Sequence, residues 1–127
     1  MRKGKKHSIR FLNLVDDARV RVQEISAETV LRRFRKGESL HLIDVREYKE
    51  FLGGHIGQCR HISKGILERD VEYFYPHLDQ EIILYCQGGF RSILAADAIQ
   101  KMGYSNVHSM AGGFRAWKEN SGPISLL

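Results

Sequence analysis

The sequence predicts an α/β domain with a central, mainly parallel sheet flanked by helices. Short apolar runs typical of buried strands alternate with segments of helical pattern, which indicates βαβ units. The length of 127 residues fits one domain with a sizeable core. The turns richest in glycine and reactive side chains each follow a strand, and parallel sheets bind ligands beyond the carboxyl ends of their strands. These turns are therefore expected to meet at one edge.

The first half of the chain is expected to hold two strands and two helices. In order, these are a strand over 21–25, a helix from 27 to about 36, a strand over 40–44 and a short helix from 47 to about 52. Ser26 is a suitable N-cap for the first helix, and Gly37 is a suitable stop. The alternation of residues 21–25 is typical of a half-buried strand.

In the second half of the chain, strands and helices again alternate, and their sequence patterns are clearer than in the first half. The elements of the second half are a short strand over 58–62, a helix over 64–74, a strand over 81–85, a helix over 91–102, a strand over 106–110 and a final helix over 114–120. The strand over 81–85 is the most apolar, which indicates a central position in the sheet. Pro76 and Gly103 follow two of the helices and fit their ends.

Composition places the chain among ordinary soluble globular proteins, with 43% hydrophobic and 28% charged residues. No apolar run approaches the roughly 20 residues that a membrane span needs. The apolar run over 11–15 is too short for the core of a signal peptide. We therefore expect a cytoplasmic protein without a membrane partner.

Positive charge is concentrated at the start of the chain. Residues 1–40 hold 11 Lys and Arg against 5 Asp and Glu, whereas residues 41–127 hold 9 against 10. This favours a basic N-terminal leader over residues 1–20, followed by a near-neutral domain over 21–127. The preferred interpretation of the leader is a solvated tail. The alternative is a segment that contacts an acidic partner; nucleic acid is not expected, because no aromatic residues for base stacking are interleaved with the basic ones.

The cysteines and histidines predict neither a disulfide framework nor a metal site. The two cysteines, Cys59 and Cys86, do not form a C-x-x-C pair, and none of the six histidines falls at metal-ligand spacing. We expect no metal and no cofactor.

Cys86 is the candidate reactive residue. It ends the most apolar strand, and Gly88 and Gly89 follow it before Arg91 opens a helix. Such glycines allow successive N–H groups to point inward as an anion-binding nest, and the start of the helix adds its positive end. These features favour a thiolate, which is the nucleophilic form of cysteine. The alternative is a buried cysteine that acts only as a small hydrophobe.

Several separated motifs together resemble the rhodanese-like sulfurtransferases. They are LIDVRE over 42–47, EF over 50–51, GHI over 54–56, YCQGGFRS over 85–92, AA over 95–96, GY over 103–104, and AGGF over 111–114 with Trp117. They follow the family's order across residues 22–123. The resemblance implies a compact three-layer α/β domain and a Cys86 that carries a sulfane sulfur as a persulfide. The chain departs from the family at Gly57-Gln58-Cys59, where Pro-Gly-Ala is usual.

The resemblance implies a reaction and its partners. The donor would be thiosulfate, a persulfide or a polysulfide, and the acceptor would be cyanide or a thiol, with a sulfur-carrier protein as one option. The loop residues implied to surround the sulfur and bind substrate are Gln87, Gly88, Gly89, Phe90, Arg91 and Ser92. A further hypothesis is that the leader guides the domain to an anionic partner such as transfer RNA or an acidic sulfur carrier.

Residues at the loop and its rim leave alternatives open. Arg91 either attracts an anionic donor or braces the loop through an internal carboxylate, and bracing is preferred. Ser92 either bonds the sulfur or caps the helix, and capping is preferred. Asp44 and Arg46 are interpreted as structural rim residues, with Asp44 capping the short helix and Arg46 pairing with Glu50 four residues on.

Four further residues or pairs have both structural and functional interpretations. His55 and Trp117 are expected to be structural. The pair Gly112-Gly113 fits either a close approach of backbone to the Cys86 pocket or a plain turn. Cys59 is expected to be inert and partly buried, and the alternative is a resolving thiol for Cys86.

Two other functions compete with sulfur transfer. One is a phosphatase of the cell-cycle dual-specificity type or an arsenate reductase, which resemble this chain in using a Cys-to-Arg loop. Four residues separate Cys86 from Arg91, whereas those phosphatases have five, and the shorter loop favours a single sulfur over a tetrahedral oxyanion. The other is a non-catalytic rhodanese-like binding module, although such modules often lack the cysteine.

Overall fold

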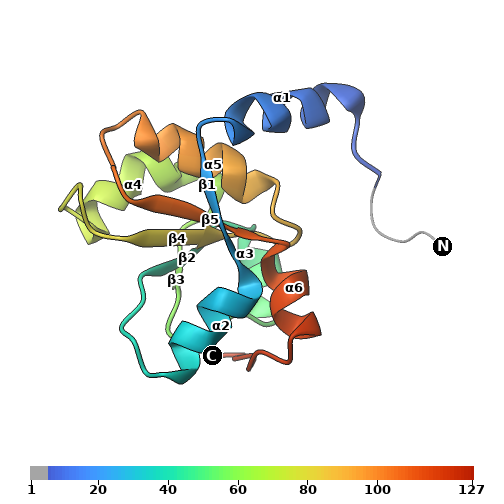
Figure 1. Cartoon of the computed structure of the whole chain (residues 1–127), viewed down its shortest axis with the longest axis vertical. Helices are drawn as coiled ribbons and strands as arrows, with labels where there is room; N and C mark the ends of the chain where they lie inside the picture. The colour runs from blue at the N-terminus through green and yellow to red at the C-terminus, as the bar shows by residue number, and fades with distance from the viewer. Residues whose placement is uncertain (1–5) are drawn as a thin grey trace.

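The computed structural model describes residues 6–127, which form a parallel sheet with helices on both faces (Figure 1). The strands are β1 (Gln23–Ser26), β2 (Leu42–Asp44), β3 (Arg60–His61), β4 (Ile82–Tyr85) and β5 (Val107–Ala111). They lie in the order β1-β5-β4-β2-β3, and each neighbouring pair is parallel. The predicted α/β class and the central place of β4 are confirmed.

The helices that connect the strands follow the predicted order, whereas α1 (Ile9–Arg19), which precedes β1, was not predicted. The other helices are α2 (Ala27–Arg35), α3 (Tyr48–Leu52), the 3₁₀ turn η1 (Lys64–Ile66), α4 (Leu67–Phe74), α5 (Arg91–Gln100) and α6 (Gly113–Glu119). Ser26 caps α2 by accepting a hydrogen bond from the Thr29 N–H at 3.0 Å, as its position predicted. Among the described helices, none is both long and apolar enough to cross a bilayer.

The core has two halves, one on each face of the sheet. Side chains of β4 alternate between them, so that Leu84 and Cys86 join the cluster under α4 and α5, whereas Ile83 and Tyr85 join the cluster under α2 and α6. All four residues of β4 are fully buried. The alternation therefore places Cys86 on the α5 side of the sheet.

The N-terminal segment is not a solvated tail where the structure describes it, and that expectation is wrong for α1. Val15 and Ala18 are buried against Ile93 of α5, and α1 lies along α5 as an additional outer helix (Figure 1). Phe11 continues the same apolar stripe at a spacing of four residues, a pattern that the neighbouring basic residues obscured. Residues 1–5 of the predicted leader lie outside the described residues.

Candidate active site around Cys86

Cys86 lies directly after β4, at the edge of the sheet where the carboxyl ends of the strands meet. Asp44 ends β2 and Ala111 ends β5 at the same edge, as the sequence predicted. The cysteine is only 1% exposed, so its sulfur sits beneath the loop that follows it.

Two backbone N–H groups of that loop converge on the sulfur. The Gly89 N–H donates to Cys86 Sγ at 3.1 Å, and the Ser92 N–H donates to it at 3.4 Å. Gly89 has a φ of 98°, which lets the chain turn back over the sulfur. The first turn of α5 begins at Arg91, so its positive end adds to the same spot. This arrangement stabilises negative charge on Cys86 Sγ.

The hydroxyl of Ser92 contacts the sulfur and does not cap the helix, so the preferred interpretation of Ser92 is wrong. Its Oγ lies 3.5 Å from Cys86 Sγ and 2.7 Å from Ser109 Oγ. The N-cap of α5 is Phe90, with no side-chain hydrogen bond. Ser92 is fully buried, and its hydroxyl finds its partners in the interior beside the cysteine.

The remaining loop residues do not reach the sulfur itself. The side chain of Gln87 accepts a hydrogen bond from Arg46 at 3.2 Å. The Phe90 ring lies against His7 and Phe11, with ring centroids 5.2 Å and 6.4 Å away. Of the predicted loop residues, Gly89 and Ser92 are thus the two that hydrogen-bond Cys86 Sγ in the described chain.

Arg91 braces the loop through a carboxylate, as preferred from the sequence. Its two terminal nitrogens donate to the two carboxylate oxygens of Glu50, both at 2.9 Å. The hydrogen bonds from Arg91 are the main reason that the pKa of Glu50 lies below its ordinary value. The brace joins the end of the loop to α3 on a neighbouring part of the rim.

Asp44 and Arg46 pair with each other, so the predicted Arg46–Glu50 pair and the predicted cap by Asp44 are both wrong. Arg46 Nη2 donates to Asp44 Oδ2 at 2.8 Å, and the Arg46 N–H donates to Asp44 Oδ1 at 2.9 Å. Both side chains are almost fully buried, which requires each charge to have a close partner. The N-cap of α3 is instead Glu47, in a capping box with Glu50.

Arg46 also connects the rim to its surroundings. It donates to the Gly54 carbonyl at 2.7 Å, and its guanidinium lies 4.5 Å from the centre of the Phe114 ring. With its bond to Gln87, the buried guanidinium links the segment after α3, the Phe114 ring of α6 and the Cys86 loop. Asp44 and Arg46 are thus buried structural residues that support the Cys86 loop from below its surface.

The start of α6 packs directly on the backbone of the Cys86 loop. The Phe114 N–H donates to the Cys86 carbonyl at 2.8 Å. Gly113 has a φ of 57°, and a Cβ at that position would lie 2.4 Å from the Cys86 carbonyl oxygen. The close approach of backbone at Gly112-Gly113 is therefore confirmed, because a side chain at Gly113 would collide with the loop.

Arg115 is a rim residue that sequence reasoning missed. Its N–H donates to the Gln87 carbonyl at 3.1 Å, and its guanidinium lies beside Gly88, where one terminal nitrogen would be 3.2 Å from an added Cβ. The sequence feature that could have indicated this position is that Arg115 follows Gly113 by only two residues. The described residues also contain no group of three or more side chains suited to hold a metal ion.

Comparison with protein families identifies the domain. The family model described as "Rhodanese-like domain" matches residues 26–120, which include every strand after β1 and the whole Cys86 loop. The chain belongs to the rhodanese-like domain family.

Similar proteins agree with the rhodanese-like assignment. YtwF of Bacillus subtilis, named as a candidate sulfurtransferase, is 31% identical over 102 residues, which are 80% of this chain and 96% of YtwF. YrkF of Bacillus subtilis, named as a candidate sulfur carrier protein, is 32% identical over 117 residues, which are 92% of this chain and 58% of YrkF. The solved structure of RPA3614 from Rhodopseudomonas palustris, described as a protein of unknown function and possible tyrosine phosphatase, superposes with a TM-score of 0.85 at 26% identity, covering 98% of this chain and 99% of that one.

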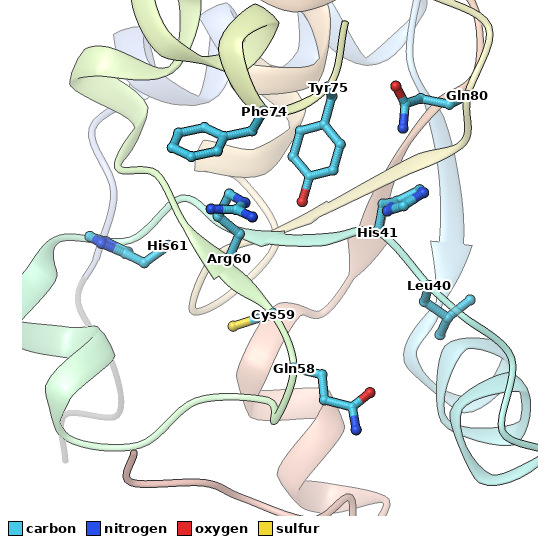
Figure 2. A pocket seen from close by; sticks show the side chains of 9 residues that line it. All are labelled: Leu40, His41, Gln58, Cys59, Arg60, His61, Phe74, Tyr75 and Gln80. Atoms are coloured by element: carbon cyan, nitrogen blue, oxygen red, sulfur yellow. The ribbon is translucent and has the colours of Figure 1, made fainter. Parts of the chain in front are cut away.

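Cys59 lies on the other side of the rhodanese-like sheet from Cys86. It packs against the cluster under α2 and α6, with its sulfur 3.4 Å from the Tyr85 hydroxyl. It lines an open hollow of about 600 Å³ beside β3, where Arg60 stacks on Phe74, and none of the residues lining this hollow belongs to the Cys86 loop (Figure 2). Burial raises the pKa of the Cys59 thiol to about 11. These contacts favour the predicted inert role.

His55 and Trp117 have the structural roles expected of them. His55 Nδ1 lies 3.0 Å from the Phe51 carbonyl, and its ring stacks on the Phe51 ring. Trp117 is fully buried, and its Nε1 donates to the Pro123 carbonyl at 2.9 Å. Trp117 packs in the half of the core under α2 and α6, on the other face of the sheet from Cys86.

Proposed function

We propose that this rhodanese-like domain is a sulfurtransferase that carries a sulfane sulfur as a persulfide on Cys86. The observation that carries the proposal is the convergence of the Gly89 and Ser92 N–H groups on a cysteine sulfur at the end of β4. Fixed N–H dipoles around a negatively charged sulfur are what this chemistry requires. The name of YtwF is consistent with the same reaction class.

The proposed reaction has two transfers. The Cys86 thiolate attacks the outer sulfur of thiosulfate, a persulfide or a polysulfide, the donor S–S bond breaks, and the leaving anion takes the electron pair. This yields the Cys86 persulfide anion. Cyanide or a thiolate then attacks the outer sulfur, and Cys86 leaves as a thiolate. No cofactor enters either step, and a sulfur-carrier protein of the kind named for YrkF is one candidate acceptor.

The loop residues that do not reach Sγ have a place in this proposal. The amides of Gln87, Gly88, Phe90 and Arg91 belong to the same tight loop and would lie around the outer sulfur once the persulfide forms. Ser92 would hold the inner sulfur through its N–H and hydroxyl. We place the reaction in the cytoplasm, where small thiols are available and where two unpaired cysteines are usual.

Two alternatives remain distinct from this proposal. The description of RPA3614 as a possible tyrosine phosphatase raises phosphoryl transfer as a second candidate. Four residues between Cys86 and Arg91 favour a loop sized for one sulfur. The guanidinium of Arg91 is also engaged by Glu50, which leaves it poorly placed for a phosphate. The third candidate is a binding module without catalysis.

The test is intact-mass measurement of the purified protein before and after incubation with thiosulfate or a polysulfide. The wild type should gain one sulfur, lose it to cyanide as thiocyanate, and fail to gain it as Cys86→Ala. Cys59→Ala serves as the matched control and should load normally. Hydrolysis of an aryl phosphate that is lost in Cys86→Ser would favour the phosphatase, and no loading from any donor would favour the binding module.

A further inference from the structure

Besides Arg19, which lies over the Phe90 ring and pairs with Glu24, three arginines lie against the Cys86 loop, and two of these three have carboxylate partners. Arg46 is buried against Asp44 at 2.8 Å, and Arg91 makes two bonds of 2.9 Å with Glu50. Their positive charges are therefore largely neutralised by the protein itself. Arg115 is the third, and no carboxylate of the described residues lies within ion-pair distance of it.

The backbone of Arg115 is fixed on the loop, and the residue is exposed. Its N–H bonds the Gln87 carbonyl, and the preceding N–H, from Phe114, bonds the Cys86 carbonyl. These two bonds hold the first turn of α6 against the first residues of the loop. The guanidinium extends over Gly88, the second residue after the cysteine, where glycine leaves room for it.

This position suits the recognition of an anion at Cys86. A guanidinium offers paired N–H donors that match two oxygens of a planar or tetrahedral oxyanion. An arginine already occupied by a carboxylate cannot do so without losing its own pair. Gly88 adds no side chain that would separate the guanidinium from a ligand above the loop.

We propose that Arg115 is a substrate-binding residue that recognises the oxyanion end of the sulfur donor, so that the site prefers donors such as thiosulfate to uncharged ones. This rests on the proposed function. With thiosulfate, Cys86 Sγ forms a bond to the outer sulfur, the S–S bond of thiosulfate breaks, and sulfite leaves with the electron pair. The products are the Cys86 persulfide anion and sulfite dianion. Arg115 binds two oxygens of the leaving sulfite and stabilises the charge that they carry.

The first experiment measures charge at Cys86 without any sulfur transfer. In a Cys59→Ala background, Cys86 is alkylated with iodoacetate, which is anionic, and with iodoacetamide, which is neutral. Arg115→Ala should lower the ratio of the two rates several-fold by slowing the anionic reagent, and Arg115→Lys should restore part of it. Lys118→Ala is the matched control, because it removes an exposed cation from the same helix.

The second experiment measures kcat/KM for thiosulfate in the same variants. Loss of a charge-assisted hydrogen bond in Arg115→Ala should reduce kcat/KM by about tenfold or more, chiefly through KM, whereas Lys118→Ala should stay close to the wild type. Circular dichroism checks that the variants are folded, which is expected because the Arg115 side chain is exposed.

The outcomes separate this inference from the function on which it rests. Equal alkylation ratios and equal KM values in Arg115→Ala and Lys118→Ala would overturn the role of Arg115 while leaving sulfur transfer intact. A wild type that takes up no sulfur, but keeps an alkylation ratio that depends on Arg115, would overturn the sulfurtransferase and make Arg115 an anion-binding residue of another reaction. An Arg115-dependent ratio together with an Arg115-dependent KM supports the inference.

Discussion

Glu50 and Arg91 form a bidentate ion pair that ties the first residue of α5, directly after the Cys86 loop, to α3. The same carboxylate accepts the Glu47 N–H at 3.0 Å, so one side chain caps α3 and holds the loop. Both partners are about one-third exposed, which limits the energy of the pair through solvent screening. The importance of the pair is therefore more in positioning than in stability.

Glu50→Gln should lower the free energy of unfolding by only about 0.5–1 kcal/mol at pH 7, because the pair is partly exposed. Its larger effect should be faster hydrogen exchange of the amides over 87–91 and slower sulfur uptake. The control is Glu81→Gln, which weakens two bonds to Arg33, at 2.6 Å and 3.2 Å, with a carboxylate of similar exposure that precedes β4 and so lies at the other end of that strand from Cys86. Equal exchange of the loop in both variants would argue against the brace.

The stability that Glu50 contributes should depend on pH in a definite direction. Arg91 holds the pKa of Glu50 below its ordinary value, so the carboxyl becomes protonated at a lower pH in the folded state than in the unfolded state. The contribution is complete above the unfolded pKa of about 4.3 and is lost as pH falls through the lower folded pKa. In urea unfolding, the free energy of unfolding of the wild type should therefore exceed that of Glu50→Gln at pH 7. This difference should become smaller below about pH 4.

Asp44→Asn should destabilise the protein far more than Glu50→Gln. It leaves the charge of Arg46 buried with only neutral partners, and breaking a buried pair typically costs about 3–5 kcal/mol. The double variant Asp44→Asn with Arg46→Met should recover part of the loss, because it removes the unpaired charge. Urea unfolding of the wild type and the variants measures this; a double variant less stable than Asp44→Asn alone would contradict the explanation.

Gly113→Ala should disrupt the close backbone contact between the start of α6 and the Cys86 loop. The added Cβ would collide with the Cys86 carbonyl at 2.4 Å, and the φ of 57° disfavours a side chain independently. We expect a loss of about 3 kcal/mol or more. Gly37→Ala is the matched control, since Gly37 has a φ of 81° with no atom near the new Cβ, and about 1 kcal/mol is expected there. Similar losses in the two variants would remove steric contact as the cause.

Iodoacetamide should distinguish the two cysteines in the native protein. Burial raises the pKa of Cys59 to about 11, so little thiolate exists there at pH 7.5. Peptide mass analysis should find Cys86 modified first, with Cys59 following only as the pH approaches 11 or after unfolding. A disulfide between Cys59 and Cys86 on mild oxidation would instead support the resolving-thiol interpretation, against their positions on opposite faces of the sheet.

The sequence predicted the features that local pattern determines. The apolar run before Cys86 gave the central strand, and the two glycines with the following helical pattern gave the loop that curls over the sulfur. Strand alternation and parallel topology were then enough to bring Asp44, Cys86 and Gly112 to one edge. These relations need no knowledge of side-chain partners.

Partner choice was the part that the sequence did not determine. Spacing alone suggested that Arg46 pairs with Glu50. Because Asp44 is buried and needs a positive partner, Arg46 pairs with Asp44, and Glu50 pairs with Arg91. Ser92 stands at a position typical of caps, yet its hydroxyl is held by Ser109 from a strand 17 residues away in sequence. Such contacts depend on the folded neighbourhood, which periodicity does not report.

The position of α1 has a practical consequence for anyone who trims this protein. The family match begins at residue 26, after the whole of α1. Cutting there would remove Val15 and Ala18 from Ile93 and uncover Phe90 at the mouth of the loop. A fragment with that boundary would expose apolar surface close to its reactive sulfur. Aggregation or low activity of such a fragment would then reflect the loss of α1 and not the chemistry of the domain.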